Sequence, residues 1–126
     1  MNDIKLKKIA PVLLRLSMSI IILWFGYQQI VDANSWLGFL PPWTTSLPIS
    51  QIDLIYLNGT FEIVFGIFLL LGFYTRFAAV MLALHLFDIT YTVGYDAIGV
   101  RDMGLAMSTL VVFFYGADSL SVDKIF

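Results

Sequence analysis

The sequence predicts an all-α integral membrane protein: a four-helix bundle with a Trp- and Pro-rich interfacial loop between its first two helices. Of the 126 residues, 60% are hydrophobic and only 13% are charged, whereas soluble domains are typically about 45–50% apolar and about 25% charged. A soluble monomer this short could not bury so much apolar surface. The length allows one domain, residues 1–126.

Four apolar segments approach the roughly 20 residues that a helix needs to cross a bilayer. We expect membrane helices at about 9–31, 52–73, 77–95 and 98–117. The fourth segment is the least clear, because its uncharged part begins only at Met103. The predicted architecture therefore has four spans, joined by short links except for the first.

The first segment could also be a secretory signal peptide, because Lys5, Lys7 and Lys8 resemble a positive n-region. Its apolar stretch is too long for that, and no small-residue cleavage pattern follows it. We therefore expect a retained membrane helix.

Lys and Arg in the short loops predict the orientation, since cytoplasmic loops carry an excess of both. Four spans place both termini and the link between the second and third helices on one side. That side holds Lys5, Lys7, Lys8, Arg76 and Lys124, and the opposite side holds Arg101. The sequence thus predicts a multi-pass protein with both termini in the cytoplasm.

The long first connection, residues 32–51, contains Trp36, Trp43, Phe39 and three prolines. Prolines oppose a continuous helix, and aromatic residues suit the headgroup layer. The connection could be an interfacial cap over the outer end of the bundle or simply an anchored loop, and both readings stay open.

Several ionisable residues fall within or beside the spans, where each costs roughly 2.5–3.5 kcal/mol at mid-helix on insertion scales. They are Arg15, Glu62, His85, Asp88, Arg101 and Asp102. The rise per residue places Glu62 and Asp88 near the midplane, and His85 shares a helix face with Asp88. Gly59 and Gly66 flank Glu62 on its own face, and small residues mark tight helix packing. Glu62 should therefore face neighbouring helices.

These residues are our candidates for ligand binding or a proton relay, and no catalytic residue is assigned. Glu62, His85 and Asp88 could relay protons or hold the head group of a quinone or another small redox molecule. They could also bind a divalent metal, although His-x-x-Asp spacing is a very weak signal. Alternatively, Arg15 or Arg101 pairs with a carboxylate, and the cluster serves packing alone.

Other chemistries are excluded by composition. The chain has no cysteine, so disulfides, thiolate metal sites and cysteine-ligated clusters are absent. A single histidine cannot supply two axial haem ligands. The formal charge of −2 and the lack of a basic patch argue against nucleic acid.

Short motifs along most of the chain resemble the DoxX-like family of small membrane proteins. The first helix carries Leu-Arg-Leu at 14–16 and Leu-Trp-Phe-Gly at 23–26. Residues 59–76 are similar to the family's most specific pattern, GxxExxxGxxLLLGxxTR. Arg101-Asp102 opens the fourth helix, and 121–123 is similar to the family's SLD ending. The chain departs from the family at Gln29, where a lysine is expected, and at Asp118, where a glycine is expected.

The resemblance implies a four-helix bundle in the cytoplasmic membrane of a bacterium or archaeon. It also implies a link to quinone oxidoreduction or to membrane complexes that handle oxidative stress. Because the chain carries no evident electron carrier of its own, we expect a quinone-interacting or accessory subunit that works with a partner redox subunit. The alternatives are a small proton-coupled carrier, which would need a homo-oligomer, and a structural or assembly subunit without chemistry.

Overall fold

The computed structural model describes residues 2–93 and 97–125, and every element within them is helical. This confirms the predicted all-α class. The long helices are α1 (Asp3–Val31), α2 (Gln51–Leu71), α3 (Thr75–Val93) and α4 (Ala97–Tyr115). Two 3₁₀ helices, η1 (Ala33–Phe39) and η2 (Pro42–Ser46), and the short α5 (Val122–Ile125) complete the fold.

The prediction of four helices with a Trp- and Pro-rich interfacial loop is therefore incomplete. The first connection is itself largely helical: η1 ends before Pro41, and η2 begins at Pro42 and ends before Pro48, so the prolines separate short 3₁₀ turns and prevent a continuous helix. Pro42 is the first residue of η2, where its missing N–H costs no hydrogen bond. Trp43 is 61% exposed and Phe39 43% exposed, so both keep aromatic surface that the rest of the chain does not cover.

Local capping sets the helix ends. Asn2 accepts a hydrogen bond from the Lys5 N–H, and α1 begins at residue 3, ahead of its apolar stretch. Ser50 caps α2 by accepting from the Asp53 N–H at 3.1 Å. Gly72 ends α2 in the left-handed conformation, with φ of 71°.

Three helices, α1, α2 and α4, are long and apolar enough to cross a membrane by length and composition. The third predicted span corresponds to α3, which does not meet the same criterion in the described residues. It is 19 residues long and carries Arg76, His85 and Asp88. The described residues thus contain three candidate spans on this criterion.

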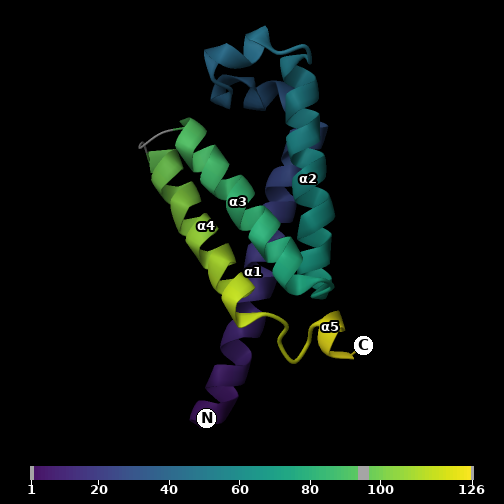
Figure 1. The fold of residues 1–126 in the computed structure, drawn as a ribbon, viewed down its shortest axis with the longest axis vertical. Coiled ribbons are helices and arrows are strands. Elements are labelled where there is room, and N and C mark those ends of the chain that lie inside the picture. Colours follow the sequence, from purple (N-terminus) through teal and green to yellow (C-terminus); the bar gives the residue numbers. More distant parts are fainter. Residues whose placement is uncertain (1, 94–96, 126) are drawn as a thin grey trace.

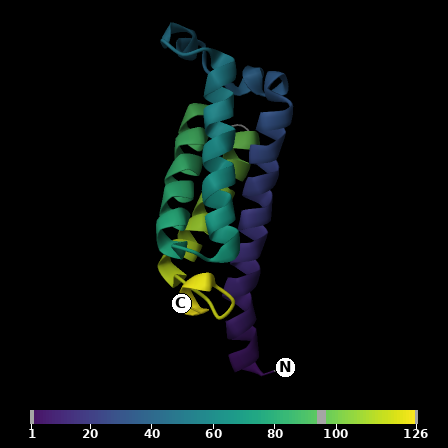
Figure 2. The same cartoon turned by 90° about the vertical axis from the view of Figure 1, so that its right-hand side faces the viewer.

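The long helices pack as two pairs, α1 with α2 and α3 with α4, and the pairs touch each other less extensively (Figures 1 and 2). The closest approach in the first pair is between two glycines. A Cβ on Gly26 would lie 2.9 Å from the Gly59 carbonyl oxygen, and one on Gly59 would lie 3.0 Å from the Gly26 oxygen. Only glycine allows this crossing.

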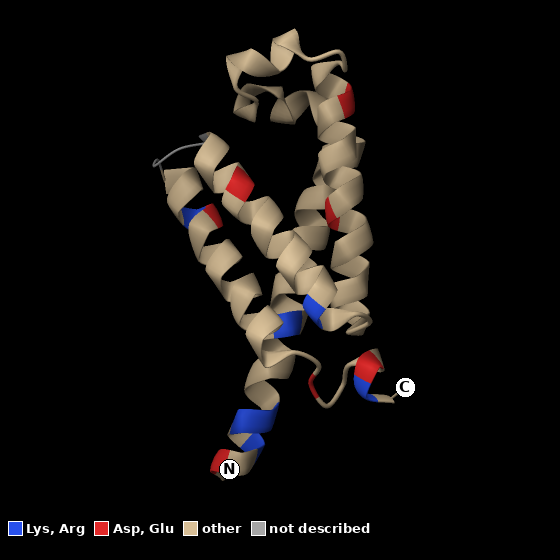
Figure 3. Cartoon of the chain, in the orientation of Figure 1, with Lys and Arg blue, Asp and Glu red and all other residues tan. Residues whose placement is uncertain are grey.

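Both chain termini lie at the same end of the molecule, beneath the turn between α2 and α3 (Figure 1). Most of the Lys and Arg residues gather at that end, whereas η1 and η2 lie at the opposite one (Figure 3). We call these the inner and outer ends. The two ends hold different polar networks.

Candidate functional site

The outer network is centred on Glu62 of α2, which is only 4% exposed. The Gln29 amide donates to Glu62 Oε2 at 3.0 Å, and the Asn58 amide donates to Oε1 at 3.2 Å. Asn58 also donates to the Gln29 carbonyl oxygen. His85 Nε2 lies 3.1 Å from Oε1. Three helices thus converge on one carboxylate.

Helix geometry explains this convergence. Asn58 and Glu62 are four residues apart, so they share the face of α2 that meets α1. Gly59 lies on that face and lets α1 come close, with Gln29 Cβ 3.1 Å from the point where a Gly59 Cβ would lie. The small-residue face and the charged face of α2 therefore coincide, as the sequence predicts.

Glu62 lies in the wall of a cavity of about 270 Å³ at the outer end. Residues from all four long helices and from η1 and η2 line it, and most of the lining is apolar or aromatic. The polar and charged lining residues are Gln29, Thr44, Asn58, Glu62, Asp88, Thr92, Arg101 and Asp102. Four of the six candidates, Glu62, Asp88, Arg101 and Asp102, thus share one cavity.

Arg101 and Asp102 are neighbours on α4 in the cavity wall. Arg101 Nη2 lies 3.7 Å from Asp102 Oδ1, and the Arg101 guanidinium carbon lies 5.6 Å from the centroid of the Phe25 ring. The Arg101 side chain is 56% exposed, whereas Asp102 is buried. Asp88 is an exposed residue of α3. The cavity therefore carries charge on three of its helices.

His85 does not line this cavity. It lies on the other side of the Glu62 carboxyl and packs against the Phe61 ring, with centroids 4.7 Å apart. Glu62 is therefore the residue that connects His85 to the cavity. Within the described residues, no three His, Asp or Glu side chains are grouped closely enough to hold a metal ion, so the geometry gives no support to a site of Glu62, His85 and Asp88.

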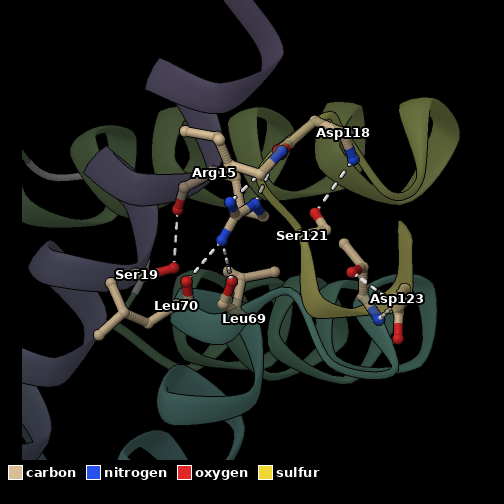
Figure 4. A network of polar contacts seen from close by, with 9 residues as sticks. Arg15, Ser19, Leu69, Leu70, Asp118, Ser121 and Asp123 are labelled. Carbon is tan, nitrogen blue, oxygen red and sulfur yellow. Dashed lines mark hydrogen bonds and ion pairs between the residues drawn. The ribbon is translucent and has the colours of Figure 1, made fainter. Parts of the chain in front are cut away.

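Arg15, the sixth candidate, belongs to a separate network at the inner end (Figure 4). Its Nε donates to Asp118 Oδ2 at 2.7 Å, and its Nη2 donates to Oδ1 at 3.3 Å. Its Nη1 donates to the carbonyl oxygens of Leu69, at 3.0 Å, and Leu70. Arg15 therefore joins the last turn of α2 to the C-terminal segment.

The same C-terminal segment caps α3. Asp123 accepts from the N–H groups of Tyr74 and Thr75, at 2.8 and 2.7 Å, and from the Thr75 hydroxyl at 2.7 Å. Partial burial raises the pKa of Asp123, but these hydrogen bonds lower it more, so it lies below its ordinary 3.8. Ser121 packs against Gly72, where a Cβ would lie 2.5 Å from the Ser121 Cβ. Asp123 thus caps α3, and Ser121 stabilises the turn beside Gly72.

Three residues of the two polar networks are not recognisable as network members from the sequence. Gln29 stands out in the sequence only as a departure from a family lysine, and Asn58 directly precedes the family pattern that begins at Gly59. The i, i+4 spacing between Asn58 and Glu62 is nevertheless a usable signal. Asp118 stands out in the sequence only because the family has a glycine at this position. Its partner Arg15 lies 103 residues away, so no local pattern connects them.

Apolar helices of membrane-spanning length, with charged side chains buried between them, define a helical membrane protein. The DoxX family model matches residues 10–95. The chain belongs to the DoxX family. No curated protein and no solved structure matches it.

Proposed function

We propose that this protein is a quinone-interacting or accessory subunit of a membrane oxidoreductase system, and that the outer cavity holds the quinone head group. The observation that supports this most directly is the cavity's construction. An apolar, aromatic wall encloses a floor where Glu62, Asn58 and Gln29 are already hydrogen-bonded to one another. Small-molecule sites have this form: mostly apolar, with a few convergent polar groups.

A quinone head group fits this chemistry. Its flat ring suits the faces of Trp36 and Phe25, and its carbonyl oxygens need hydrogen-bond donors. Arg101 is the donor that we assign, because a guanidinium has five N–H groups and this side chain is more than half exposed. The carboxamides of Asn58 and Gln29 hold Glu62 in place beside the ring.

A partner subunit follows from the composition. The chain has no cysteine and one histidine, so electrons must come from a redox protein that carries its own cofactor. The proposed assembly places the DoxX chain at the quinone and the partner at the electron source.

The proposed membrane arrangement has four spans, with α3 crossing beside the three more apolar helices. Asp88 and Thr92 of α3 line the cavity, and His85 contacts Glu62, which lowers the cost of placing a histidine in a span. The inner end, with Lys5, Lys7 and Lys8, lies in the cytoplasm, and η1 and η2 lie at the outer interface of a prokaryotic cytoplasmic membrane.

Binding of naphthoquinone to the purified protein in nanodiscs tests this function. We expect Glu62→Gln and Arg101→Gln to weaken binding by about tenfold or more, which corresponds to about 1.4 kcal/mol. Asp53→Asn is the matched control, because Asp53 is an exposed carboxylate on α2 outside the cavity. Wild-type affinity in both cavity variants would refute the assignment.

The second candidate function is a proton-coupled carrier, and the Glu62–His85 contact supports it. Uptake of one proton by the Glu62–His85 pair would change the charge of the cavity floor, and buried ionisable pairs often mark ion pathways. Four helices form a narrow path, so this function calls for a homo-oligomer. Solute flux into proteoliposomes that is abolished by Glu62→Gln and by His85→Ala, at unchanged protein stability, would favour it over quinone binding.

The third candidate is a structural or assembly subunit. The inner network supports it, because Arg15 and Asp118 join segments of the chain outside the lining of the outer cavity. This candidate predicts that the activity of the whole complex follows the thermal stability of each Glu62 variant. Loss of activity at unchanged stability would exclude it.

A further inference from the structure

The outer cavity carries an unequal balance of charge. Among its described lining residues, three carboxylates, Glu62, Asp88 and Asp102, face one guanidinium, Arg101. Their formal charge is −2 at pH 7, and protonation of His85 behind Glu62 would only reduce it to −1. Apolar walls strengthen such a field, because they screen charge less than water does.

The single guanidinium is already engaged. It lies beside Asp102 and over the Phe25 ring. Asp88 makes no hydrogen bond or ion pair with any other described residue, and it lines the cavity from α3. Asp88 is thus a carboxylate whose charge no neighbouring group in that part of the chain neutralises, and a molecule bound in the cavity can reach it.

The walls around these carboxylates are aromatic. Phe25, Trp36, Phe39 and Trp43 contribute to the lining from α1, η1 and η2. Aromatic faces attract cations, and tryptophan does so best. Arg101 over Phe25 shows that one of these faces already accepts a positive group.

We propose that the outer cavity binds lipophilic organic cations, such as quaternary aromatic ammonium ions, and rejects anions of the same shape. Aromatic walls would enclose the cationic group while Asp88 and Glu62 supply the opposite charge. The proposal rests on the cavity of the proposed function but not on its redox role, and it implies that any quinone bound there carries no acidic substituent.

Three ligands of similar size and different charge test this proposal. Phenyltrimethylammonium is a cation, N,N-dimethylaniline is its neutral counterpart at pH 7, and benzenesulfonate is an anion. Quenching of Trp36 and Trp43 fluorescence reports binding, and a Trp24→Phe background removes the tryptophan that lies outside the cavity lining. We expect the cation to bind about tenfold more tightly than the neutral amine, in keeping with cation–π energies, and the anion to show no binding.

Substitutions then locate the selectivity. Asp88→Asn should weaken cation binding about tenfold and leave the neutral amine unchanged, and Asp88 is exposed, so this variant should fold. Arg101→Gln should strengthen cation binding, because it removes the competing positive charge. Asp53→Asn should change neither. A structural role of Asp88 would alter all ligands alike.

The outcomes separate this proposal from the proposed function. Equal affinity for cation and neutral amine, or binding of the anion, overturns the charge selectivity whether or not naphthoquinone binds. Cation binding without naphthoquinone binding overturns the quinone assignment and supports the selectivity. Failure of Asp88→Asn and Glu62→Gln to weaken cation binding also overturns the proposal.

Discussion

Arg15 of α1 and Asp118 of the C-terminal segment form a buried ion pair, with 2.7 Å between Nε and Oδ2 and side chains that are 2% and 1% exposed. Arg15 also donates to the carbonyl oxygens of Leu69 and Leu70 at the end of α2. A cation is favourable there because the last carbonyls of a helix lack partners and carry partial negative charge. This one side chain therefore fixes three segments at the inner end.

Removing either partner of this pair should destabilise the protein strongly. Arg15→Leu leaves Asp118 buried without its counter-charge, which typically costs about 3–5 kcal/mol. The double variant Arg15→Leu/Asp118→Leu should lose much less than the sum of the two single losses, since no charge is left unpaired. Unfolding in detergent measures the free energies, with Lys8→Leu as the control at an exposed cation of α1. Additive losses would show that the pair is not coupled.

The inner end should also be sensitive to acid. Burial raises the pKa of Asp118, but hydrogen bonds from Arg15 and the Leu120 N–H lower it by more than burial raises it. The folded-state pKa therefore lies below 3.8. The Asp123 carboxyl shifts in the same direction. A depressed pKa contributes stability above the unfolded value, and that stability is lost as the pH falls through the folded value.

We therefore expect the free energy of unfolding to fall as the pH decreases below 3.8. The measurement is unfolding as a function of pH for the wild type and for Asp123→Asn. The variant should be less stable at pH 7, and its curve should converge with that of the wild type at low pH. A constant difference down to the acid limit would contradict the role of the Asp123 carboxylate.

The sequence predicts more of this fold along each helix than between helices. Hydrophobicity and caps indicate where helices lie, and the rise per residue places Glu62 and Asp88 at similar depth. These rules say nothing about which residue of another helix a side chain meets. Arg15 shows the consequence: it is recognisable as a buried charge, but its partner Asp118 lies beyond the last long helix.

The candidate site is also only partly predictable. Glu62 is identifiable because a carboxylate between two glycines must face a neighbouring helix, and the structure brings His85 to it. Gln29 is not identifiable in this way, since an amide near a helix end also suits the interface. The cavity itself depends on how η1 and η2 fold over the helices, and 3₁₀ turns leave little periodicity in so short a stretch.

The absence of cysteine makes the proposed orientation testable with single thiols. Lys7→Cys and Lys124→Cys place a thiol at the inner end, and Ser46→Cys places one in η2, all at exposed positions. A membrane-impermeant maleimide added to intact cells or spheroplasts should label only Ser46→Cys. The other two should react after permeabilisation, and the parent chain should never react. The reverse pattern would place the termini outside.

The glycine crossing between α1 and α2 should not tolerate a methyl group. In Gly26→Ala the new Cβ would lie 2.9 Å from both the Gly59 carbonyl oxygen and an Ile63 side-chain carbon, so the helices must separate. Overpacking of this kind typically costs about 1–3 kcal/mol.

Separation of the helices would also pull Gln29 away from Glu62, so Gly26→Ala and Gly59→Ala should both weaken ligand binding in the cavity. Gly104→Ala is the matched control, because nothing lies within 4 Å of its added Cβ, and a helical alanine is favoured over glycine by about 1 kcal/mol. Unfolding and naphthoquinone binding measured on all three variants check this, and equal behaviour of Gly26→Ala and Gly104→Ala would show that the close crossing does not hold the Glu62 network.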